Sequence, residues 1–392
     1  MSDALPKVLS FRAQRLMDSI SRSTVRVPWT ASGTKASGEV IQFNLPPVIM
    51  DLRSIKMYFT LSVSGAPTAA VIPVADAIIR QVDIAVSGYG VTQLPRYGKV
   101  VSQLKQLTWP TAKQASQPYS WNVDILSGPA IVQGFAYGLL SGTHQRYLDL
   151  STFRNTTLTL TLADLTAITT LTGGTSPAVS GVTNCYLTFE GVSFAQDTYR
   201  RALRSVKHLK VPFKSISSYT SPSFQASGID FPITKASESL DKIMVFCSAP
   251  AYQTTAGEFF KSLYDANGLI NVELGGTLLN SWSLQEAQGE IRANTDSALA
   301  MDGPGGFGGI QNDAITTALW RTDYWASIYN LCLPGAQSTG LVSGVSTYYI
   351  ASPIIVHATT PGFATDAVLV VALECTKSLT IDTETGELSQ TE

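Results

Sequence analysis

The histidines are the first residues to consider for metal chemistry. The sequence has three, His144, His208 and His357, and none has a second histidine at metal-ligand spacing. The patterns HxH, HExxH and CxxC are all absent, which argues against cupin-like or zinc-dependent catalysis. We therefore interpret each histidine as an isolated buried or solvated side chain, and we predict neither a metal nor a cofactor.

The four cysteines are the next candidates, because a thiolate can act as a nucleophile. They are Cys185, Cys247, Cys332 and Cys375, and they lie far apart in the chain. Three of them, Cys185, Cys247 and Cys375, stand in apolar, strand-like runs. A cysteine in such a run usually packs as a small buried hydrophobe. We predict buried free thiols, which suits assembly in a reducing cytosol.

Two unusual segments carry no complete catalytic or binding motif. Residues 303–309 are rich in glycine, but no Gly-Lys-Ser/Thr follows, so a phosphate-binding P-loop is not supported. Residues 382–387 hold clustered acids, but the alternation that an EF-hand needs is incomplete. A serine elbow and a carboxylate pair are also missing. We predict no catalytic residues, and we predict that the protein is not an enzyme.

The composition favours a protein whose flanks are covered by neighbours. The chain has 392 residues, enough for two domains, and charged residues make up only 14% of it, against about 25% in typical soluble domains. The net charge of −2 gives no sign of a general polyanion binder. No apolar window is long enough to predict a membrane-spanning helix, and basic residues interrupt the N-terminus, so no secretion signal is predicted.

The first 38 residues are predicted to form an amphipathic helix followed by a linker arm. Apolar residues recur at helical spacing up to Ile20, and the small, polar residues 30–38 indicate an extended linker. From Lys7 to Lys35 only one acid, Asp18, accompanies the basic residues of this arm, which are Lys7, Arg12, Arg15, Arg22, Arg26 and Lys35.

Beyond the arm, the hydrophobic pattern changes to period two. Residues 55–63 alternate five times between apolar and polar side chains, and similar short runs recur along the chain between clusters of Gly, Pro, Ser and Thr. Because successive side chains of a strand point to opposite faces, these runs predict strands with one buried face. Many short strands of this kind indicate an all-β sandwich or barrel.

A weak internal repeat predicts two similar halves. Residues 82–91 and 270–279 share the same shape, a strand, a glycine turn and a second apolar start, and each precedes a more helical stretch. Their offset is 188 residues (270 minus 82), which fits a duplicated domain. We predict one domain over residues 39–205 and a second over 206–392. The basic join at residues 199–214 is either a solvated linker or an inward-facing contact with lipid, nucleic acid or protein.

Several segments resemble landmarks of the double-jelly-roll major capsid proteins of tailless icosahedral viruses. Phe43-Asn-Leu-Pro46 followed by Asp51-Leu52 is similar to the family's "FNIP" strand and "DL" turn. Further similar landmarks follow in the family's order at residues 77–91, 185–194, 239–246 and 270–279. The resemblance extends roughly from Val40 to Ile381. One departure is the turn Ser87-Gly-Tyr-Gly, where Gly-Gly is usual. The chain has no room for long tower loops, which points to a small, phage-like member.

The resemblance implies an all-β fold of two tandem eight-stranded jelly rolls and a role as major capsid protein. Homotrimers would form pseudo-hexameric capsomers that tile an icosahedral virion shell, assembled inside the host cell. The partners would be other copies of the chain, and penton or minor capsid proteins. An internal lipid membrane is a further possible partner through the N-terminal arm, and no specific nucleic-acid recognition is expected.

The basic arm would then lie at the inner face of the shell, against a membrane, the genome or a neighbour. Near anionic lipid each basic side chain gains about 1 kcal/mol. The alternative is that the helix docks on its own domain. The candidate contact residues are Lys7, Arg12, Arg15, Arg22 and Arg26.

An alternative function is a viral receptor- or carbohydrate-binding β-sandwich, as in a spike or fibre protein. Trp320, Tyr324, Trp325 and Tyr329 could form a sugar-binding platform, but their spacing is equally that of a packed helix or turn. We favour packing for this cluster.

Overall fold

The computed structural model of the chain describes the greater part of its residues. They are 21–30, 33–108, 119–142, 145–153, 155–193, 206, 208–224, 228–256, 258, 261–283, 286–287, 325–332, 343–348, 350, 353–359, 366–382 and 387–391.

The first half forms two antiparallel sheets that pack face to face. One has the order β1-β12-β3-β8, and β9 also pairs with β3; the other has the order β2-β10-β5-β6. The bounds of the first sheet are β1 (Ser21–Pro28), β12 (Ala178–Ser193), β3 (Ile49–Ser64), β8 (Ala130–Gln133) and β9 (Tyr147–Asp149). Those of the second are β2 (Val40–Asn44), β10 (Thr156–Leu162), β5 (Ile79–Val86) and β6 (Tyr89–Pro95). A small third sheet joins β11 (Thr170–Thr172), β4 (Ala69–Val74) and β7 (Trp121–Asp124).

The second half repeats the strand order of the two main sheets. Its sheets have the orders β13-β20-β15-β18, with β21 also on β20, and β14-β19-β16-β17. The first comprises β13 (His208–Thr220), β20 (Val368–Asp382), β15 (Leu240–Ser248), β18 (Ser327–Asn330) and β21 (Leu388–Thr391). The second comprises β14 (Ile229–Ile233), β19 (Ile354–Thr359), β16 (Leu269–Leu274) and β17 (Thr277–Ser283). Two sheets of four strands in this order form a jelly roll, so the predicted pair of tandem rolls is confirmed.

The internal repeat corresponds to one hairpin in each roll. Residues 82–91 belong to β5 and β6, and residues 270–279 to β16 and β17. Both turn residues have positive φ in each hairpin: Ser87 (51°) and Gly88 (81°) in the first, Gly275 (61°) and Gly276 (79°) in the second. Such turns match the twist of the strands that they join, which explains why glycine marks the repeat.

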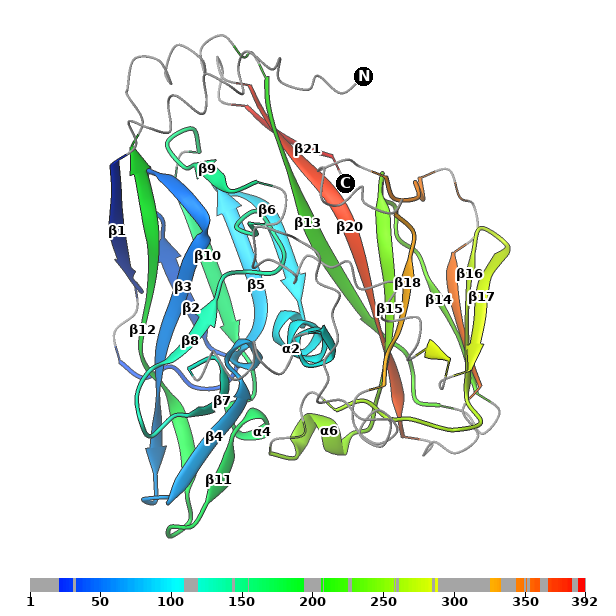
Figure 1. Cartoon of the computed structure of the whole chain (residues 1–392), viewed down its shortest axis with the longest axis horizontal. Helices are drawn as coiled ribbons and strands as arrows, with labels where there is room; N and C mark the ends of the chain where they lie inside the picture. The colour runs from blue at the N-terminus through cyan, green and yellow to red at the C-terminus, as the bar shows by residue number, and fades with distance from the viewer. Residues whose placement is uncertain are drawn as a thin grey trace.

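Short helices lie outside the sheets. Among the described residues they are η1 (Ala75–Ile78), α2 (Tyr97–Thr108), α4 (Leu165–Ile168) and α6 (Ala251–Thr254). The predicted helical stretch after residue 96 is thus confirmed as α2, which lies between the two rolls (Figure 1). A search of the described helices finds none that is long and apolar enough to cross a membrane.

The interior of each roll is filled by the inward side chains of its strands. On β3, Met57, Phe59 and Leu61 are buried in alternation with polar residues, as the period-two pattern predicts. All four cysteines are free. Cys185, Cys247 and Cys375 are buried, whereas Cys332 is partly exposed. The predicted free thiols are confirmed, and Cys332 is the exception to full burial.

Part of the predicted N-terminal arm is a strand. Residues 21–28 form β1, which pairs with β12 and places Val25 opposite Phe189 and Val27 opposite Leu187. The assignment of these residues to a helix and linker arm was wrong. Pairing satisfies the backbone groups of β12, and Val27 is buried beneath the sheet. The predicted helix itself falls on residues 1–20, which lie outside the described residues.

Candidate assembly surfaces and the joint between the rolls

A polar interface joins the two rolls. On the side of the first roll, it is formed by β6 and by the segment after β8. Arg96, directly after β6, donates a hydrogen bond to Thr220 Oγ1 of β13. Ser218 Oγ of β13 donates to the carbonyl of Pro95 at 3.1 Å. These bonds hold an edge strand of one roll against an edge strand of the other.

A sharp turn after β8 inserts a tyrosine into the second roll. Gly138 N donates to the carbonyl of Lys214 at 2.7 Å, and Tyr137 Oη donates to Glu374 Oε2 at 3.1 Å. Gly138 has φ +91°, and a Cβ there would lie 2.8 Å from Thr92 Cγ2, so the turn requires glycine. Burial and the charge of Glu374 raise the pKa of Tyr137 well above its usual range, so it remains a donor.

Helix α2 adds a buried lysine to the same joint. Lys99 Nζ donates to Ser248 Oγ of β15 at 3.1 Å, and Gln103 Nε2 donates to the carbonyl of Lys261 at 3.3 Å. Burial, and to a lesser extent the charge of Arg96, lower the pKa of Lys99 to about 8. The joint therefore carries an ammonium group that costs folding free energy at neutral pH.

A cluster of three charged groups lies inside the second roll, next to the joint. Lys214 Nζ is 2.5 Å from Asp241 Oδ2 and 3.6 Å from Glu374 Oε1. The side chains come from β13, β15 and β20, and each is at least 95% buried. The prediction that Lys214 belongs to a solvated linker or an inward-facing contact was wrong. A signal existed in the sequence: Asp241 and Glu374 each interrupt an apolar strand, where an acid needs a partner.

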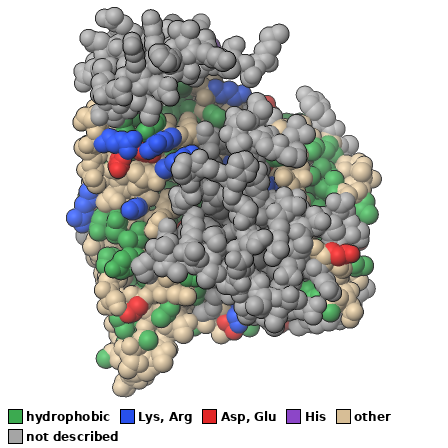
Figure 2. Space-filling model, in the orientation of Figure 1, with side chains coloured by type: hydrophobic (Ala, Val, Ile, Leu, Met, Phe, Trp, Pro, Cys, Tyr) green, Lys and Arg blue, Asp and Glu red, His purple; other side chains and the backbone are tan. Residues whose placement is uncertain are grey.

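The outer face of the first sheet carries a stack of arginine and tyrosine side chains. Arg26 lies 3.8 Å above the ring centroid of Tyr186, and that ring stacks on Tyr58 at 4.8 Å. Arg22 Nη1 bonds Glu190 Oε2 at 3.0 Å, and its Nη2 donates to Tyr147 Oη at 3.3 Å. Lys and Arg side chains gather over the upper part of the first roll in the view of Figure 2.

This outer flank is where the structure places two of the five predicted contact residues. Arg22 and Arg26 share strand β1, so the structure brings them to one edge of the first roll. Lys7, Arg12 and Arg15 lie outside the described residues, and their predicted contacts stay predictions. The tyrosines of the flank were missed from the sequence, because alternate strand positions far apart in the chain meet only through pairing of β12 with β3.

The second roll has a histidine held between two acids on its outer sheet. His357 Nδ1 is 2.7 Å from Asp230 Oδ1, and Nε2 is 3.3 Å from Glu273 Oε2, across the three strands β14, β19 and β16. Burial lowers the pKa of His357, but the two carboxylates outweigh that effect and the net shift is upward. His357 is therefore not isolated, and the fraction of the imidazole that is protonated rises as the pH falls.

The described residues show neither a metal centre nor a sugar platform. No group of three or more His, Cys, Asp or Glu side chains among them could hold a metal ion. Trp325 and Tyr329 are 0% and 3% exposed, so this half of the aromatic cluster packs in the core. Trp320 and Tyr324 lie outside the described residues.

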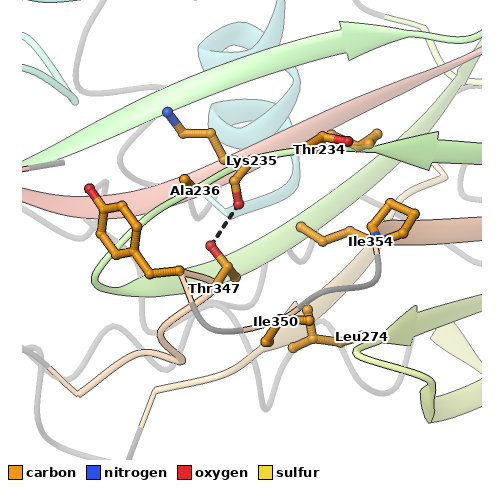
Figure 3. A pocket seen from close by; sticks show the side chains of 10 residues that line it. Thr234, Lys235, Ala236, Leu274, Thr347, Ile350 and Ile354 are labelled. Carbon is orange, nitrogen blue, oxygen red and sulfur yellow. Dashed lines mark hydrogen bonds between the residues drawn. The ribbon is translucent and has the colours of Figure 1, made fainter.

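A small pocket opens at one end of the second roll (Figure 3). Its volume is about 260 Å³, and Ile233, Leu274 and Ile350 give it an apolar wall. Thr347 Oγ1 donates to the carbonyl of Lys235 at 2.6 Å and fixes its rim. Ligand sites usually exceed about 300 Å³ and contain several convergent polar groups, so nothing assigns a ligand to this pocket.

Comparison with solved structures identifies the fold. PBCV-1 VP54, fitted into a reconstruction of the virophage Sputnik, is 10% identical with a TM-score of 0.64, covering 95% of this chain and 97% of that one. The Faustovirus major capsid protein is 8% identical with a TM-score of 0.63, covering 92% and 90%. The mavirus major capsid protein is 10% identical with a TM-score of 0.51, covering 94% and 90%. No family model matches the sequence, and no curated protein matches it significantly. Over most of its length the chain therefore has the double-jelly-roll fold.

Proposed function

We propose that this chain is the major capsid protein of an icosahedral virus, and that three copies form a pseudo-hexameric capsomer of the virion shell. The observation that carries the proposal is the repeated strand order of two rolls standing side by side in one chain (Figure 1). Three such chains around a threefold axis present six barrels in a roughly hexagonal outline. The similar Faustovirus and mavirus chains are themselves major capsid proteins.

The joint between the rolls supports this role. A capsomer tiles a shell only if the angle between its barrels is fixed. Hydrogen bonds from Arg96, Tyr137 and Lys99 cross the joint to three strands of the second roll. Because Tyr137 and Lys99 are buried, water does not compete for their two bonds. Together with the Arg96 bond, they would hold the two rolls at a fixed angle.

The outer flank of the first roll is the proposed contact with a neighbouring copy. Arginine and tyrosine are enriched in protein interfaces, where they supply contact area together with hydrogen bonds. Arg26, Tyr186 and Tyr58 form such a surface, and stacking already fixes their side chains. Since Arg22 and Arg26 are engaged with their own sheet, we assign them to this lateral contact rather than to a membrane or the genome.

The remaining parts of the account follow from the same proposal. The arm with Lys7, Arg12 and Arg15 would contact a membrane, the genome or a neighbour at the inner face of the shell. Penton or minor capsid proteins would be further partners, and assembly would occur in the host cell. A phage-like origin and the absence of catalysis also stay predictions.

Sedimentation velocity of the purified protein tests the proposal. We expect a trimer that dissociates at low concentration, and larger assemblies at high concentration. Replacing Tyr186 with Ser is expected to weaken association, whereas Tyr119→Ser, a change at a 55% exposed side chain, serves as the matched control. A wild-type protein that remains monomeric at every concentration would contradict the proposal.

The alternative of a receptor- or carbohydrate-binding spike finds no support in the described residues. Its platform would need Trp325 and Tyr329 at the surface, and both are buried. Binding of the isolated protein to a glycan array, without any self-association, would favour it over the capsid role.

A further inference from the structure

Three reactive groups meet on adjacent strands of the second roll. Lys214 is on β13 and Asp241 on β15, and Glu374 is on β20, the strand between them. The amine of Lys214 lies 2.5 Å from Asp241 Oδ2, and Glu374 Oε1 lies 3.6 Å from the same amine. An amine, a carboxyl group and a second carboxyl group at these separations are the components of an amide condensation.

The backbone of β15 is irregular at the position of the aspartate. The register between β15 and β20 shifts between Leu240 and Lys242, so Asp241 occupies the irregular position. A bulge re-aims a side chain that regular pairing would direct elsewhere. In this roll the irregularity lies at Asp241, whose carboxylate reaches Lys214 two strands away.

The cluster is closed to water. Lys214 is 3% exposed, and Asp241 and Glu374 are 0% exposed. Gly344 covers the carboxylate, because a Cβ at that position would lie 2.4 Å from Asp241 Oδ1. Tyr137 of the first roll donates a hydrogen bond to Glu374. A site without bulk water favours a reaction that releases water and protects its product from hydrolysis.

We propose that Lys214 and Asp241 form an intramolecular isopeptide bond after folding, with Glu374 as the proton shuttle. The lone pair of neutral Lys214 Nζ forms a bond to Cγ of the protonated Asp241 carboxyl group. The Cγ–Oδ2 bond then breaks. Oδ2 leaves as water with the hydrogen of the acid and one hydrogen of the amine. No oxidant or other reactant is required.

The hydrogen-bond partners of the two Asp241 oxygens suit the two roles that the reaction requires: Oδ1 stays in the amide, and Oδ2 leaves as water. Oδ1 accepts hydrogen bonds from Ser239 Oγ at 2.7 Å and Cys332 Sγ at 3.1 Å. These donors would stabilise the charge that develops on Oδ1 in the tetrahedral intermediate. Oδ2 accepts from Thr376 Oγ1 at 2.6 Å, a donor for the departing oxygen.

Glu374 is placed to move the proton between the reacting groups. Its Oε1 is buried and has no hydrogen-bond partner among the described residues, whereas Oε2 accepts from Tyr137. The 3.6 Å separation from Lys214 Nζ is slightly longer than a hydrogen bond, as is common before a reacting complex tightens.

A stable ion pair is the competing account of the same contacts. Burial lowers the pKa of Lys214, but the charges of Glu374 and Asp241 outweigh it, so the ammonium form dominates before reaction. A minor neutral population suffices, because loss of water makes the product permanent. The bond would also replace two buried charges, whose desolvation is expensive, by one neutral amide.

The intact mass of the denatured full-length protein distinguishes the two accounts. The isopeptide bond lowers the mass by one water molecule relative to the sequence, whereas an ion pair leaves it unchanged. Fragmentation should place the bond between Lys214 and Asp241. A wild-type mass without the loss of water overturns the proposal. Because this measurement uses only the wild-type protein, it does not depend on whether a variant folds.

Three variants test which side chains take part in the loss of water. Lys214→Arg and Glu374→Gln should each restore the full mass, and Lys210→Arg, at an exposed lysine of the same strand, should keep the loss of water. The cross-link closes a loop between residues 27 positions apart, so the wild type should also migrate faster than Glu374→Gln on a denaturing gel. Loss of water that persists in Lys214→Arg would identify a different reaction, such as cyclisation of an aspartate, and refute the assignment.

Discussion

Replacing Lys99 with Met should stabilise the protein, although it removes a hydrogen bond. Lys99 lies on α2 in the joint between the rolls, and the residue is only 7% exposed. Burial and the charge of Arg96 lower its pKa from 10.5 to about 8. The folded state therefore holds this proton less tightly than the unfolded chain does.

The magnitude follows from the pKa shift. Each pKa unit corresponds to about 1.4 kcal/mol, so the shift from 10.5 to about 8 represents a cost of about 3 kcal/mol to the folded state. Loss of the Lys99–Ser248 hydrogen bond offsets about 1 kcal/mol of the gain. Lys99→Met should thus raise the free energy of unfolding by about 2 kcal/mol near neutral pH, since methionine fills a similar space without a charge.

The gain should depend on pH in a defined direction. Below pH 8 Lys99 is protonated in both states and the cost is fully present. Between about pH 8 and 10.5 the folded protein loses the proton first, so the wild type gains stability relative to the variant.

Denaturant unfolding of both proteins at several pH values and one fixed protein concentration measures this difference. Lys56→Met, at an exposed lysine of β3, is the control and should show no such convergence. A wild type that is more stable than Lys99→Met at neutral pH, or a difference that stays constant up to pH 10, would refute the reasoning.

Two further predictions concern buried and bridging hydrogen bonds. Tyr137→Phe should lower the free energy of unfolding by about 2 kcal/mol, because it leaves the buried Glu374 Oε2 without its donor; unchanged stability in denaturant unfolding would contradict this role. His357→Gln should cost more stability at about pH 6 than at about pH 8. The raised pKa of His357 means that its bonds to Asp230 and Glu273 contribute below the unfolded pKa and fade as the pH rises through the folded one. Equal losses at the two pH values would show that its charge is irrelevant.

The overall fold was predictable because local patterns carry it. Strands with one buried face show in the alternation of residues 55–63, and the glycine turns at Gly88 and Gly276 mark equivalent hairpins. Strand β1 was missed, since Ser21–Pro28 has apolar side chains only at Val25 and Val27 before its end, too few to distinguish a strand from an arm.

The polar groups inside the structure were less predictable. Lys214, Asp241 and Glu374 meet only through the pairing of β13 and β15 with β20, and the register shift that brings Asp241 into place leaves no pattern in the sequence. Likewise, Arg26 and Tyr186 meet only across the β1–β12 pair. A sequence indicates which residues are unusual for their strand, but long-range register decides which of them meet.

Electron microscopy of the purified protein tests the central claim most directly. If the chain is a capsid protein built from two upright rolls, class averages should show a trimer with six barrels in a pseudo-hexagonal outline, and shells where trimers associate. Particles of two barrels only, unchanged in outline at every concentration, would contradict it.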